Sequence, residues 1–161
     1  CRGDASHRLR YLTSLRVAAI TQGAESAGRT KTDVALSCAI FVVTGKDAQE
    51  MANNSAIVRS QIAFYASTPS YSTVMEMHGW MDLHERLNAL SREGKWYEMG
   101  DLISDDMLNE FAVVAPLDEL PHAVMERYNG LLDRVGYYFP FVPGEADKEM
   151  VWKRAAEVFC A

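Results

Sequence analysis

The sequence has few cysteines, and their spacing excludes the structures that cysteines most often build. Cys1, Cys38 and Cys160 are odd in number and far apart, with no CxxC pair and no histidine partner at zinc-finger spacing. A disulfide framework and a structural zinc site are therefore excluded as organising features. We interpret these cysteines as reduced thiols, which predicts a cytoplasmic protein.

Long hydrophobic runs are also missing. No apolar segment approaches the length of about 18 residues that a membrane helix needs, and no charged-then-apolar leader precedes a small-residue cleavage site. The sequence therefore predicts no membrane partner and no export. It begins CRGDASH without methionine, which indicates a truncated reading frame, an artificial end or a fragment.

Positive charge is scarce relative to negative charge. Sixteen Lys and Arg residues stand against 22 Asp and Glu residues, a formal net charge of −6 at pH 7. Nucleic-acid binding needs clustered cations that neutralise phosphates, whereas the cations here are interspersed with carboxylates. We therefore expect no nucleic-acid partner. With 48% hydrophobic residues, the 161 residues are long enough to bury the core of one ordinary domain.

Several functional motifs are incomplete or missing. Thr44-Gly45-Lys46 lacks the upstream glycine and the following Ser or Thr of a phosphate-binding loop. No G-x-S-x-G elbow and no G-x-G-x-x-G fingerprint occurs, which disfavours a serine hydrolase and a Rossmann dehydrogenase. His78 and His84 are six positions apart rather than four, so they do not share a helix face as zinc-binding histidines do. The sequence therefore predicts no metal site.

Hydrophobic periodicity predicts an alternation of helices and strands. Apolar runs at residues 34–43, 111–114 and 134–139 are typical of strands, and the first is typical of a parallel strand buried on both faces. Apolar residues at helical spacing predict helices near residues 9–19, 47–66, 82–94, 96–103, 104–108, 120–131 and 147–158, with Gly23 or Gly28 ending the first. Asp47 with Glu50, and Ser104, are predicted helix caps.

The segment at residues 59–80, RSQIAFYASTPSYSTVMEMHGW, is the predicted centre of the chain. Proline cannot continue a helix and pushes the preceding residue out of the helical region, so the helix ends at Thr68-Pro69. Aromatic side chains with one imidazole at such a break often line a pocket, although the same cluster can be plain packing. Four of them lie on or beside this break: Tyr65, Tyr71, His78 and Trp80.

Two α/β folds are compatible with these elements, a small doubly wound sheet and a part of a (β/α)8 barrel. Strands separated by helices call for parallel pairing with right-handed crossovers. A complete barrel needs eight strands and about 250 residues, far more than the strand patterns of this chain supply. A small parallel sheet would also expose two unpaired edges, which favours self-association or covering by a missing segment.

Six short motifs follow one another along the chain: FVVTG at residues 41–45, IAFYASTPSY at 62–71, HGW at 78–80, G-x-W at 94–96, FAVV at 111–114 and R-V-x-x-Y at 134–138. Their order resembles the C-terminal part of the luciferase-like monooxygenase family, in its deazaflavin (coenzyme F420)-dependent oxidoreductase branch. The resemblance implies one partial domain over residues 1–161, the C-terminal portion of a (β/α)8 TIM barrel with about three parallel strands and an α-helical excursion. The family's N-terminal strands, which supply much of the coenzyme and substrate site, have no counterpart here.

The resemblance implies an oxidoreductase that transfers a hydride between coenzyme F420, or alternatively FMN, and a small organic substrate. Its chemistry would collect at the carboxyl ends of the strands, as barrel chemistry does. The implied pocket combines the turn after the first strand with the central segment: Thr44, Gly45, Tyr65, Ser67, Thr68, Tyr71, His78 and Trp80. The implied partner is the missing N-terminal barrel half or a second copy of the chain.

Two alternatives remain open at this point. The chain could be a truncated, non-catalytic barrel fragment that self-associates, or a stand-alone small-molecule-binding α/β module. Asp118 and Glu119 would repel a phosphate at the one helix N-terminus that could otherwise bind it. We therefore expect the isolated chain to bind the coenzyme only weakly.

Overall fold

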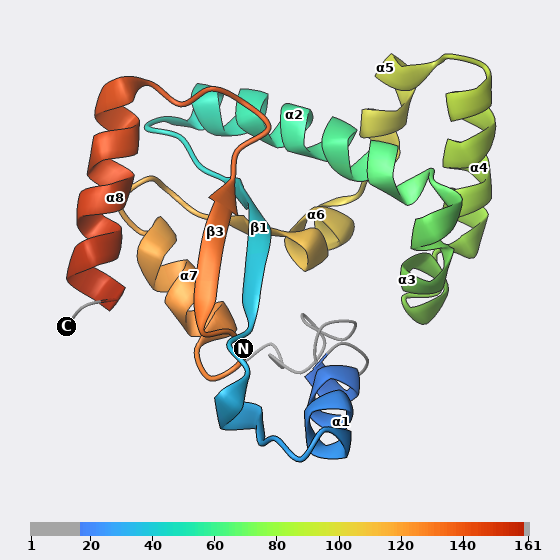
Figure 1. The fold of residues 1–161 in the computed structure, drawn as a ribbon. Coiled ribbons are helices and arrows are strands. Elements are labelled where there is room, and N and C mark those ends of the chain that lie inside the picture. The colour runs from blue at the N-terminus through green and yellow to red at the C-terminus, as the bar shows by residue number, and fades with distance from the viewer. Residues whose placement is uncertain (1–16, 160–161) are drawn as a thin grey trace, which may run out of the picture.

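The computed structural model describes residues 17–159 and confirms the predicted alternation of helices and strands (Figure 1). The leucines of the first predicted helix before residue 17, and Cys1 and Cys160, lie outside the described residues. The elements follow in the order α1 (Ala18–Ser26), η3 (Lys31–Asp33), β1 (Ser37–Val43), α2 (Ala48–Ala66), η4 (Pro69–Tyr71), α3 (Ser72–Met77), α4 (Met81–Arg92), α5 (Trp96–Met99), η5 (Gly100–Leu102), α6 (Asp105–Phe111), β2 (Ala112–Val114), α7 (Leu120–Tyr128), β3 (Arg134–Tyr138) and α8 (Glu145–Phe159), where η marks a 3-10 helix.

The three strands form one parallel sheet in the order β2-β1-β3. Phe41 pairs with Ala112 of β2, and Ser37 pairs with Arg134 of β3. The start of β3 is fixed to β1 by the Asp133 carboxylate, which accepts a hydrogen bond of 2.7 Å from the Leu36 backbone N–H. The longest strand, β1, therefore lies between the other two, and the shorter strands form the edges of the sheet.

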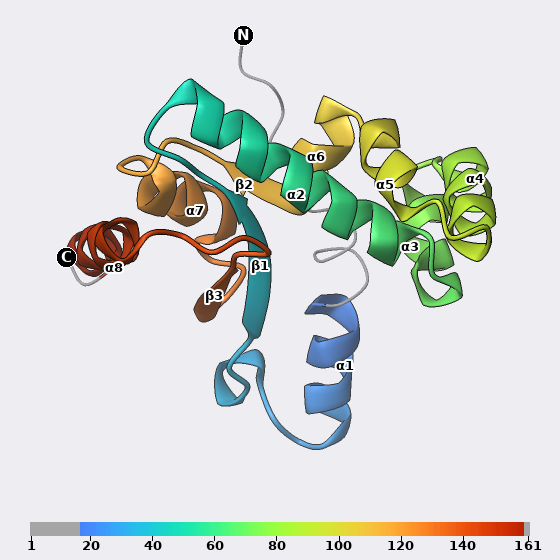
Figure 2. The same ribbon diagram turned by 90° about the horizontal axis from the view of Figure 1, so that it is seen from above.

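This strand order is that of a doubly wound sheet, because a barrel would place the three strands in consecutive order. Right-handed crossovers that run in opposite directions along a sheet put their helices on opposite faces. Accordingly, α2 packs against the face of β1 that carries Phe41 and Val43, while α7 and α8 pack against the face that carries Ile40 and Val42 (Figure 2). The described residues by themselves therefore do not take the predicted arrangement of a barrel portion.

Strand β1 is shorter and less buried than its apolar sequence predicts. It begins at Ser37 rather than at residue 34, and only its second half, from Ile40 onward, approaches full burial. The physical reason is the shortness of β2, which pairs with β1 only from Phe41 to Val43 and leaves the first half of that edge unpaired among the described residues. The prediction of a strand buried on both faces is thus correct only for its carboxyl half.

Helix α2 is closed at both ends by side chains. The Asp47 carboxylate accepts a hydrogen bond of 2.8 Å from the Glu50 N–H, which confirms the predicted cap. The last carbonyl groups of the helix are bound by side chains from α4: His84 Nδ1 lies 2.6 Å from the Ala66 oxygen, and Asn88 donates to the Ser67 oxygen at 2.9 Å. Helix α4 therefore fixes where α2 stops and where the following segment begins.

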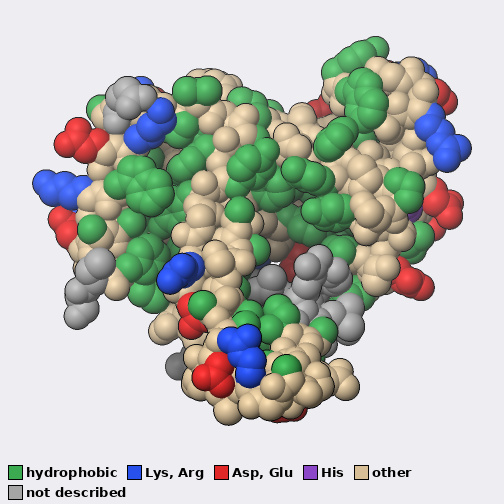
Figure 3. All heavy atoms as spheres, in the orientation of Figure 1, with side chains coloured by type: hydrophobic (Ala, Val, Ile, Leu, Met, Phe, Trp, Pro, Cys, Tyr) green, Lys and Arg blue, Asp and Glu red, His purple; other side chains and the backbone are tan. Residues whose placement is uncertain are grey.

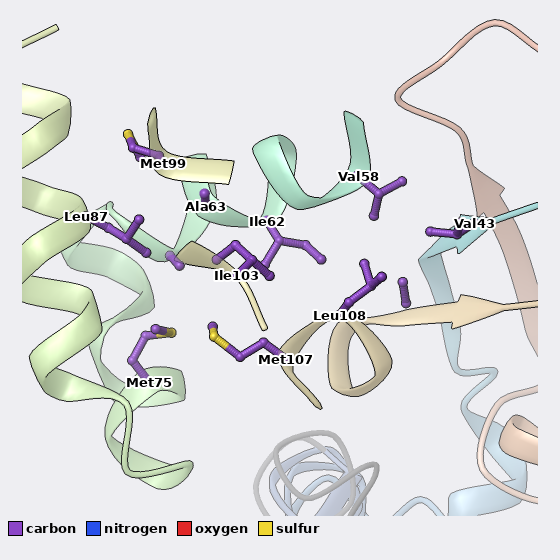
Figure 4. Close-up of a cluster of buried hydrophobic side chains, with 12 residues drawn as sticks. Val43, Val58, Ile62, Ala63, Met75, Leu87, Met99, Ile103, Met107 and Leu108 are labelled. Atoms are coloured by element: carbon purple, nitrogen blue, oxygen red, sulfur yellow. The ribbon is translucent and has the colours of Figure 1, made fainter. Parts of the chain in front are cut away.

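The larger core lies between α2 and the helices that follow it, at the end of the molecule away from α8 (Figures 1 and 4). Ile62, Leu87 and Met107 meet there from α2, α4 and α6, with relative exposures of 3% or less. Burying side chains of this size contributes about 1.5–3 kcal/mol each. The Arg59 guanidinium also donates to the Ile103 carbonyl and pairs with Asp105, which ties α2 to the start of α6.

The second core lies on the other face of the sheet and is closed less completely. Ile40, Val124 and Val151 form its centre. Apolar side chains remain on the surface around β3 and α8, where Trp152 is 59% exposed and stacks on Tyr137 at a centroid distance of 5.8 Å (Figure 3). Burial raises the pKa of the Tyr137 phenol to about 12, so this group is neutral at physiological pH.

Several predicted boundaries shift by one to three positions. Helix α1 runs through Gly23, and Gly28 with φ +69° follows its end. Phe111 belongs to α6 rather than to β2, because α6, capped as predicted by Ser104, continues through it. Strand β3 ends at Tyr138, helix α7 ends before residue 131, and α8 begins at Glu145. Within the described residues, no helix is both long and apolar enough to cross a membrane.

Candidate functional site

A cavity of about 550 Å³ opens beside the amino-terminal half of β1. Within residues 17–159, no strand lies beside this half of β1 on the β2 side, and helix ends surround it instead. Its walls come from α1, β1, η4, α3 and the last residues of α6 and α7, and they are mainly apolar. Polar or ionisable groups reach it from eight positions: Ser37, Cys38, Ser70, Tyr71, His78, Glu110, Arg127 and Tyr128.

His78 and Glu110 are two partly buried ionisable side chains that approach each other in the cavity wall. His78 Nε2 lies 3.7 Å from Glu110 Oε1, and the two side chains are 9% and 14% exposed. The His78 ring stacks on Trp80 at a centroid distance of 4.6 Å and an interplanar angle of 14°. Phe111 approaches the same imidazole edge-on at 6.3 Å. The imidazole is therefore held between aromatic rings, with one nitrogen directed toward a carboxylate.

A helix C-cap places His78 and Trp80. The Trp80 N–H donates to the Met75 carbonyl at 2.8 Å, and the Gly79 N–H donates to the Glu76 carbonyl at 3.0 Å. This is the hydrogen-bond pattern of a Schellman motif, which requires a left-handed residue at the position of Gly79, with φ +73°. The His-Gly-Trp sequence therefore reverses the chain at the end of α3 and brings the two rings into contact.

Arg127 connects α7 to the end of α6 and the start of β2. Its guanidinium donates to the carbonyl groups of Asn109 at 2.9 Å, of Ala112 at 2.7 Å, and of Glu110. The neighbouring Tyr128 ring lies 5.5 Å from the guanidinium carbon. Burial raises the pKa of the Tyr128 phenol, with the Arg127 charge acting in the opposite direction. Arg127 thus fixes the backbone that carries Glu110.

The structure brings part of the predicted central segment to this cavity. Tyr71 lines it, and Tyr65 stacks on Tyr71 at 5.4 Å without lining it. Ser67 and Thr68 have a structural role instead, because their hydroxyl groups donate to the Phe64 and Tyr65 carbonyls at 2.7 and 2.8 Å. Trp80 reaches the site indirectly, through its stacking on His78.

Thr44 and Gly45 lie away from the cavity, at the opposite, carboxyl end of β1. The Thr44 carbonyl accepts a hydrogen bond of 2.7 Å from Asn54, and its hydroxyl is buried without a hydrogen-bond partner. A Cβ on Gly45 would lie 2.8 Å from the Met51 nitrogen, so this glycine permits a close approach to α2. The predicted single wall of strand-end turn and central segment is therefore not formed in the described chain.

Glu110 and Arg127 were not predicted as site residues. Glu110 directly precedes the predicted strand at residues 111–114, and Arg127 directly precedes Tyr128 of the apolar pattern in α7. In the sequence each is only a charged residue beside an apolar segment. The structure shows that they meet, because the Arg127 guanidinium donates to the Glu110 carbonyl. No group of three or more His, Cys, Asp or Glu in the described part of the chain could hold a metal ion.

Comparison with known proteins gives the family. The sequence profile of the luciferase-like monooxygenase family matches residues 6–134. The chain belongs to the luciferase-like monooxygenase family. Proteins of Mycobacterium bovis and of two strains of Mycobacterium tuberculosis, each described as uncharacterized, are 47% identical to this family member over 126 residues. The match covers 78% of this chain and 37% of each relative, so the chain spans just over a third of their length.

The match to the luciferase-like monooxygenase family can be placed on the structure. The matched residues include β1, the whole helical excursion and β2, and they end at the first residue of β3. The cavity described above is therefore built almost entirely from the part of the chain that the family shares.

Proposed function

We propose that the chain is the C-terminal part of a luciferase-like oxidoreductase that transfers a hydride between a deazaflavin (F420) or FMN and a small organic substrate. The observation that carries the proposal is the cavity beside β1, in which aromatic and apolar walls surround the partly buried His78–Glu110 pair. The cofactor would supply the hydride chemistry, while the protein binds the ring, orients it and excludes water. Tyr71 and Phe111 would provide apolar contact area for such a ring.

The cavity suits the ring of such a cofactor better than its phosphate. A volume of about 550 Å³ lies within the range of small-molecule sites, which is roughly 300–1,000 Å³. Arg127 is the one Lys or Arg among the described lining residues, and its guanidinium already donates to three backbone carbonyls. At the start of α7, Asp118 and Glu119 are exposed carboxylates that repel anions. The described lining residues thus suit the ring and provide no second Lys or Arg that would neutralise a phosphate or an acidic tail.

The relatives are long enough to contain phosphate donors and strands beyond those that the described residues provide. The aligned region covers 37% of their length, so further segments are available for phosphate donors and for additional strands. In a longer protein built as a barrel, β3 would lie beside β2, and another strand would take the edge of β1 that β3 occupies here. The proposed partner of the chain is therefore such a segment, or a second copy that covers its edge strands, in a cytoplasmic protein.

A second candidate function is a stand-alone module that binds a small planar molecule. The doubly wound strand order favours it, because the longest strand already has a partner strand on each side within the chain. The two candidates differ in catalysis and share the cavity.

The ring site is tested by titrating riboflavin, FMN and coenzyme F420 into the 161-residue chain and following ligand fluorescence. We expect weak, saturable binding in which riboflavin and FMN have similar affinities, because Arg127 is the one Lys or Arg of the described lining and already donates to three backbone carbonyls. Ala39→Phe should abolish binding, since Ala39 is an exposed lining residue whose enlargement fills the cavity. Ala52→Phe, at an exposed position of α2 outside the cavity, is the matched control.

Two outcomes would contradict this proposal. Unchanged binding in Ala39→Phe would place the ring elsewhere. Micromolar, saturable binding of coenzyme F420 that is much tighter than that of riboflavin would mean that the phosphate donors lie within these 161 residues. The catalytic part is tested on the chain extended to the length of its relatives, where oxidation of the reduced cofactor by a substrate is expected and its absence with both cofactors would favour the binding module.

A further inference from the structure

Helix α2 carries apolar side chains on its exposed face as well as on its buried face. Ile57, Gln61 and Phe64 stand at positions i, i+4 and i+7, so they form one ridge of the helix. Ile57 and Phe64 are 42% and 44% exposed. A groove of about 390 Å³ lies between this ridge and α5, and its lining residues are Ile57, Ser60, Gln61, Phe64, Trp96 and Met99. We call it the α2–α5 groove.

The end of α4 places Trp96 in this groove. The Lys95 N–H donates to the Leu90 carbonyl at 3.0 Å across Gly94, whose φ is +73°, as in a Schellman motif. The Trp96 ring then lies 5.8 Å from the Phe64 ring and remains 47% exposed. Apolar side chains accordingly reach the surface over α5 (Figure 3). The G-x-W motif at residues 94–96 therefore builds a surface aromatic pair that the cavity beside β1 does not use.

The α5 side of the groove is rich in negative charge. Residues 93–106 carry five exposed carboxylates and one lysine: Glu93, Lys95, Glu98, Asp101, Asp105 and Asp106. Lys95 pairs with Glu93 at 2.7 Å, and Asp105 pairs with Arg59 of α2. Among the described residues, no cation lies within ion-pair distance of the other three carboxylates. This side of the groove therefore attracts further cations.

Glu98 and Asp101 lie beside the groove itself. Glu98 directly precedes the lining residue Met99, and Asp101 directly follows Gly100. A Cβ on Gly100 would lie 2.7 Å from Ser60 Oγ, so the backbone at this point is in close contact with the groove wall on α2. The two carboxylates are therefore next to the apolar surface, where a bound segment would meet them.

We infer that the α2–α5 groove binds the apolar face of an amphipathic helix of another protein, whose flanking positions carry Lys and Arg. Helices bind to apolar grooves through anchors at i, i+3 or i+4, and i+7. Exposed aromatic side chains such as Phe64 and Trp96 are typical of the centres of such interfaces. Charges around the groove then select the partner and its orientation.

A second copy of this chain fits the groove less well. No described helix carries more Lys and Arg residues than Asp and Glu residues. Helix α8 exposes Met150 and Trp152, but it carries four carboxylates and three cations. Its insertion would bring further carboxylates to an acidic rim, and like charges across an interface are unfavourable. An excess of cations therefore indicates a different protein.

The test titrates three helical peptides into the 161-residue chain and follows the amide NMR signals of residues 57–64 and 96–99. The first peptide has leucine at i, i+4 and i+7 and lysine and alanine elsewhere. The second has glutamine in place of the leucines, and the third has glutamate in place of the lysines. We expect the first to bind at least tenfold tighter than the other two, because only it matches both the apolar groove and the acidic rim.

Two tryptophan variants locate the binding surface. Trp96→Ala removes the exposed aromatic wall and should weaken binding of the first peptide about tenfold, as truncation of an interface tryptophan does. Trp152→Ala is the matched control, because Trp152 is also exposed and stacked on one aromatic ring, but lies on α8. It should change the affinity less than about twofold.

Two double variants test the charges. Glu98→Gln with Asp101→Asn should weaken binding of the first peptide about fivefold, as the loss of two exposed ion pairs does. Asp118→Asn with Glu119→Gln removes the same two charges at the exposed start of α7 and should leave the affinity unchanged.

Three results would overturn the inference. Equal binding of the two lysine peptides, or equal weakening in both double variants, would show unspecific attraction to an acidic chain. Self-association in light scattering that Trp96→Ala abolishes would assign the groove to a second copy. A failure of riboflavin to bind would contradict the proposed function alone, because the α2–α5 groove and the cavity beside β1 share no lining residue.

Discussion

Ile40→Asp is expected to unfold the domain. Ile40 is 4% exposed in the central strand and lies in the core that α7 and α8 form on one face of the sheet. An unpaired carboxylate there costs several kcal/mol, which is comparable to the total stability of a domain, about 5–15 kcal/mol. Because β1 pairs with both other strands, its loss would separate the whole sheet. Circular dichroism and the amide NMR spectrum would report the loss of folded structure.

The matched control is the same substitution at an exposed isoleucine. Ile57 on α2 is 42% exposed, so Ile57→Asp places its carboxylate in water and should leave the domain folded. A cooperatively melting Ile40→Asp protein with dispersed amide signals would show that this face of β1 is not a core. If both variants unfold, the stability of the domain is too low for this comparison. The milder substitutions Ile40→Ala and Ile57→Ala would then replace them, and we expect the larger loss of stability from Ile40→Ala.

Arg127→Met is expected to lower the free energy of unfolding by about 3 kcal/mol, because hydrogen bonds from a charged donor contribute about 1.5–3 kcal/mol each and are not additive. The guanidinium donates to the carbonyl groups of Asn109, Glu110 and Ala112, which close α6 and open β2. Methionine keeps much of the aliphatic length and removes every donor. Urea unfolding followed by circular dichroism measures the change as a lower transition midpoint.

Arg86→Met on α4 is the matched control, since Arg86 is exposed and should tolerate the loss of its charge. Equal stability of the two variants would mean that the backbone at the start of β2 is held by packing alone. The Arg127→Met protein should also bind riboflavin more weakly than the Arg86→Met protein, because the backbone of Glu110 at the cavity loses its support. If the Arg127→Met protein is less stable but binds riboflavin as before, Arg127 has a structural role and does not contribute to the binding site.

Local sequence determined most of the secondary structure. Asp47 and Ser104 cap the helices that they were predicted to cap, because a side-chain oxygen at that position binds an N–H group that the helix itself leaves unpaired. The break at Thr68-Pro69 follows equally from the chemistry of proline. Gly79 and Gly94 take the left-handed conformation at helix ends, which glycine adopts at little cost. These signals act over a few residues and can be recognised in a linear sequence.

The candidate site could be predicted only in part. Of the residues assigned to the pocket, Tyr71 and His78 line this cavity, and both follow the proline break. Thr44 and Gly45 were assigned to the same wall on the expectation of a barrel, whose site collects the carboxyl ends of its strands. In the structure they lie at the end of β1 opposite to the cavity. The local sequence pattern identified the aromatic segment at residues 59–80. The expectation of a barrel led to a wrong position for the turn at Thr44 and Gly45.

The sequence by itself determined the order of helices and strands, the helix caps and the aromatic segment, because each depends on neighbours within a few positions. Only the tertiary structure decided the strand order β2-β1-β3, the cavity beside the unpaired half of β1 and the approach of His78 to Glu110. These features depend on which edge of β1 each later strand occupies. That choice is made by long-range pairing and packing, which a periodic pattern along one segment does not encode.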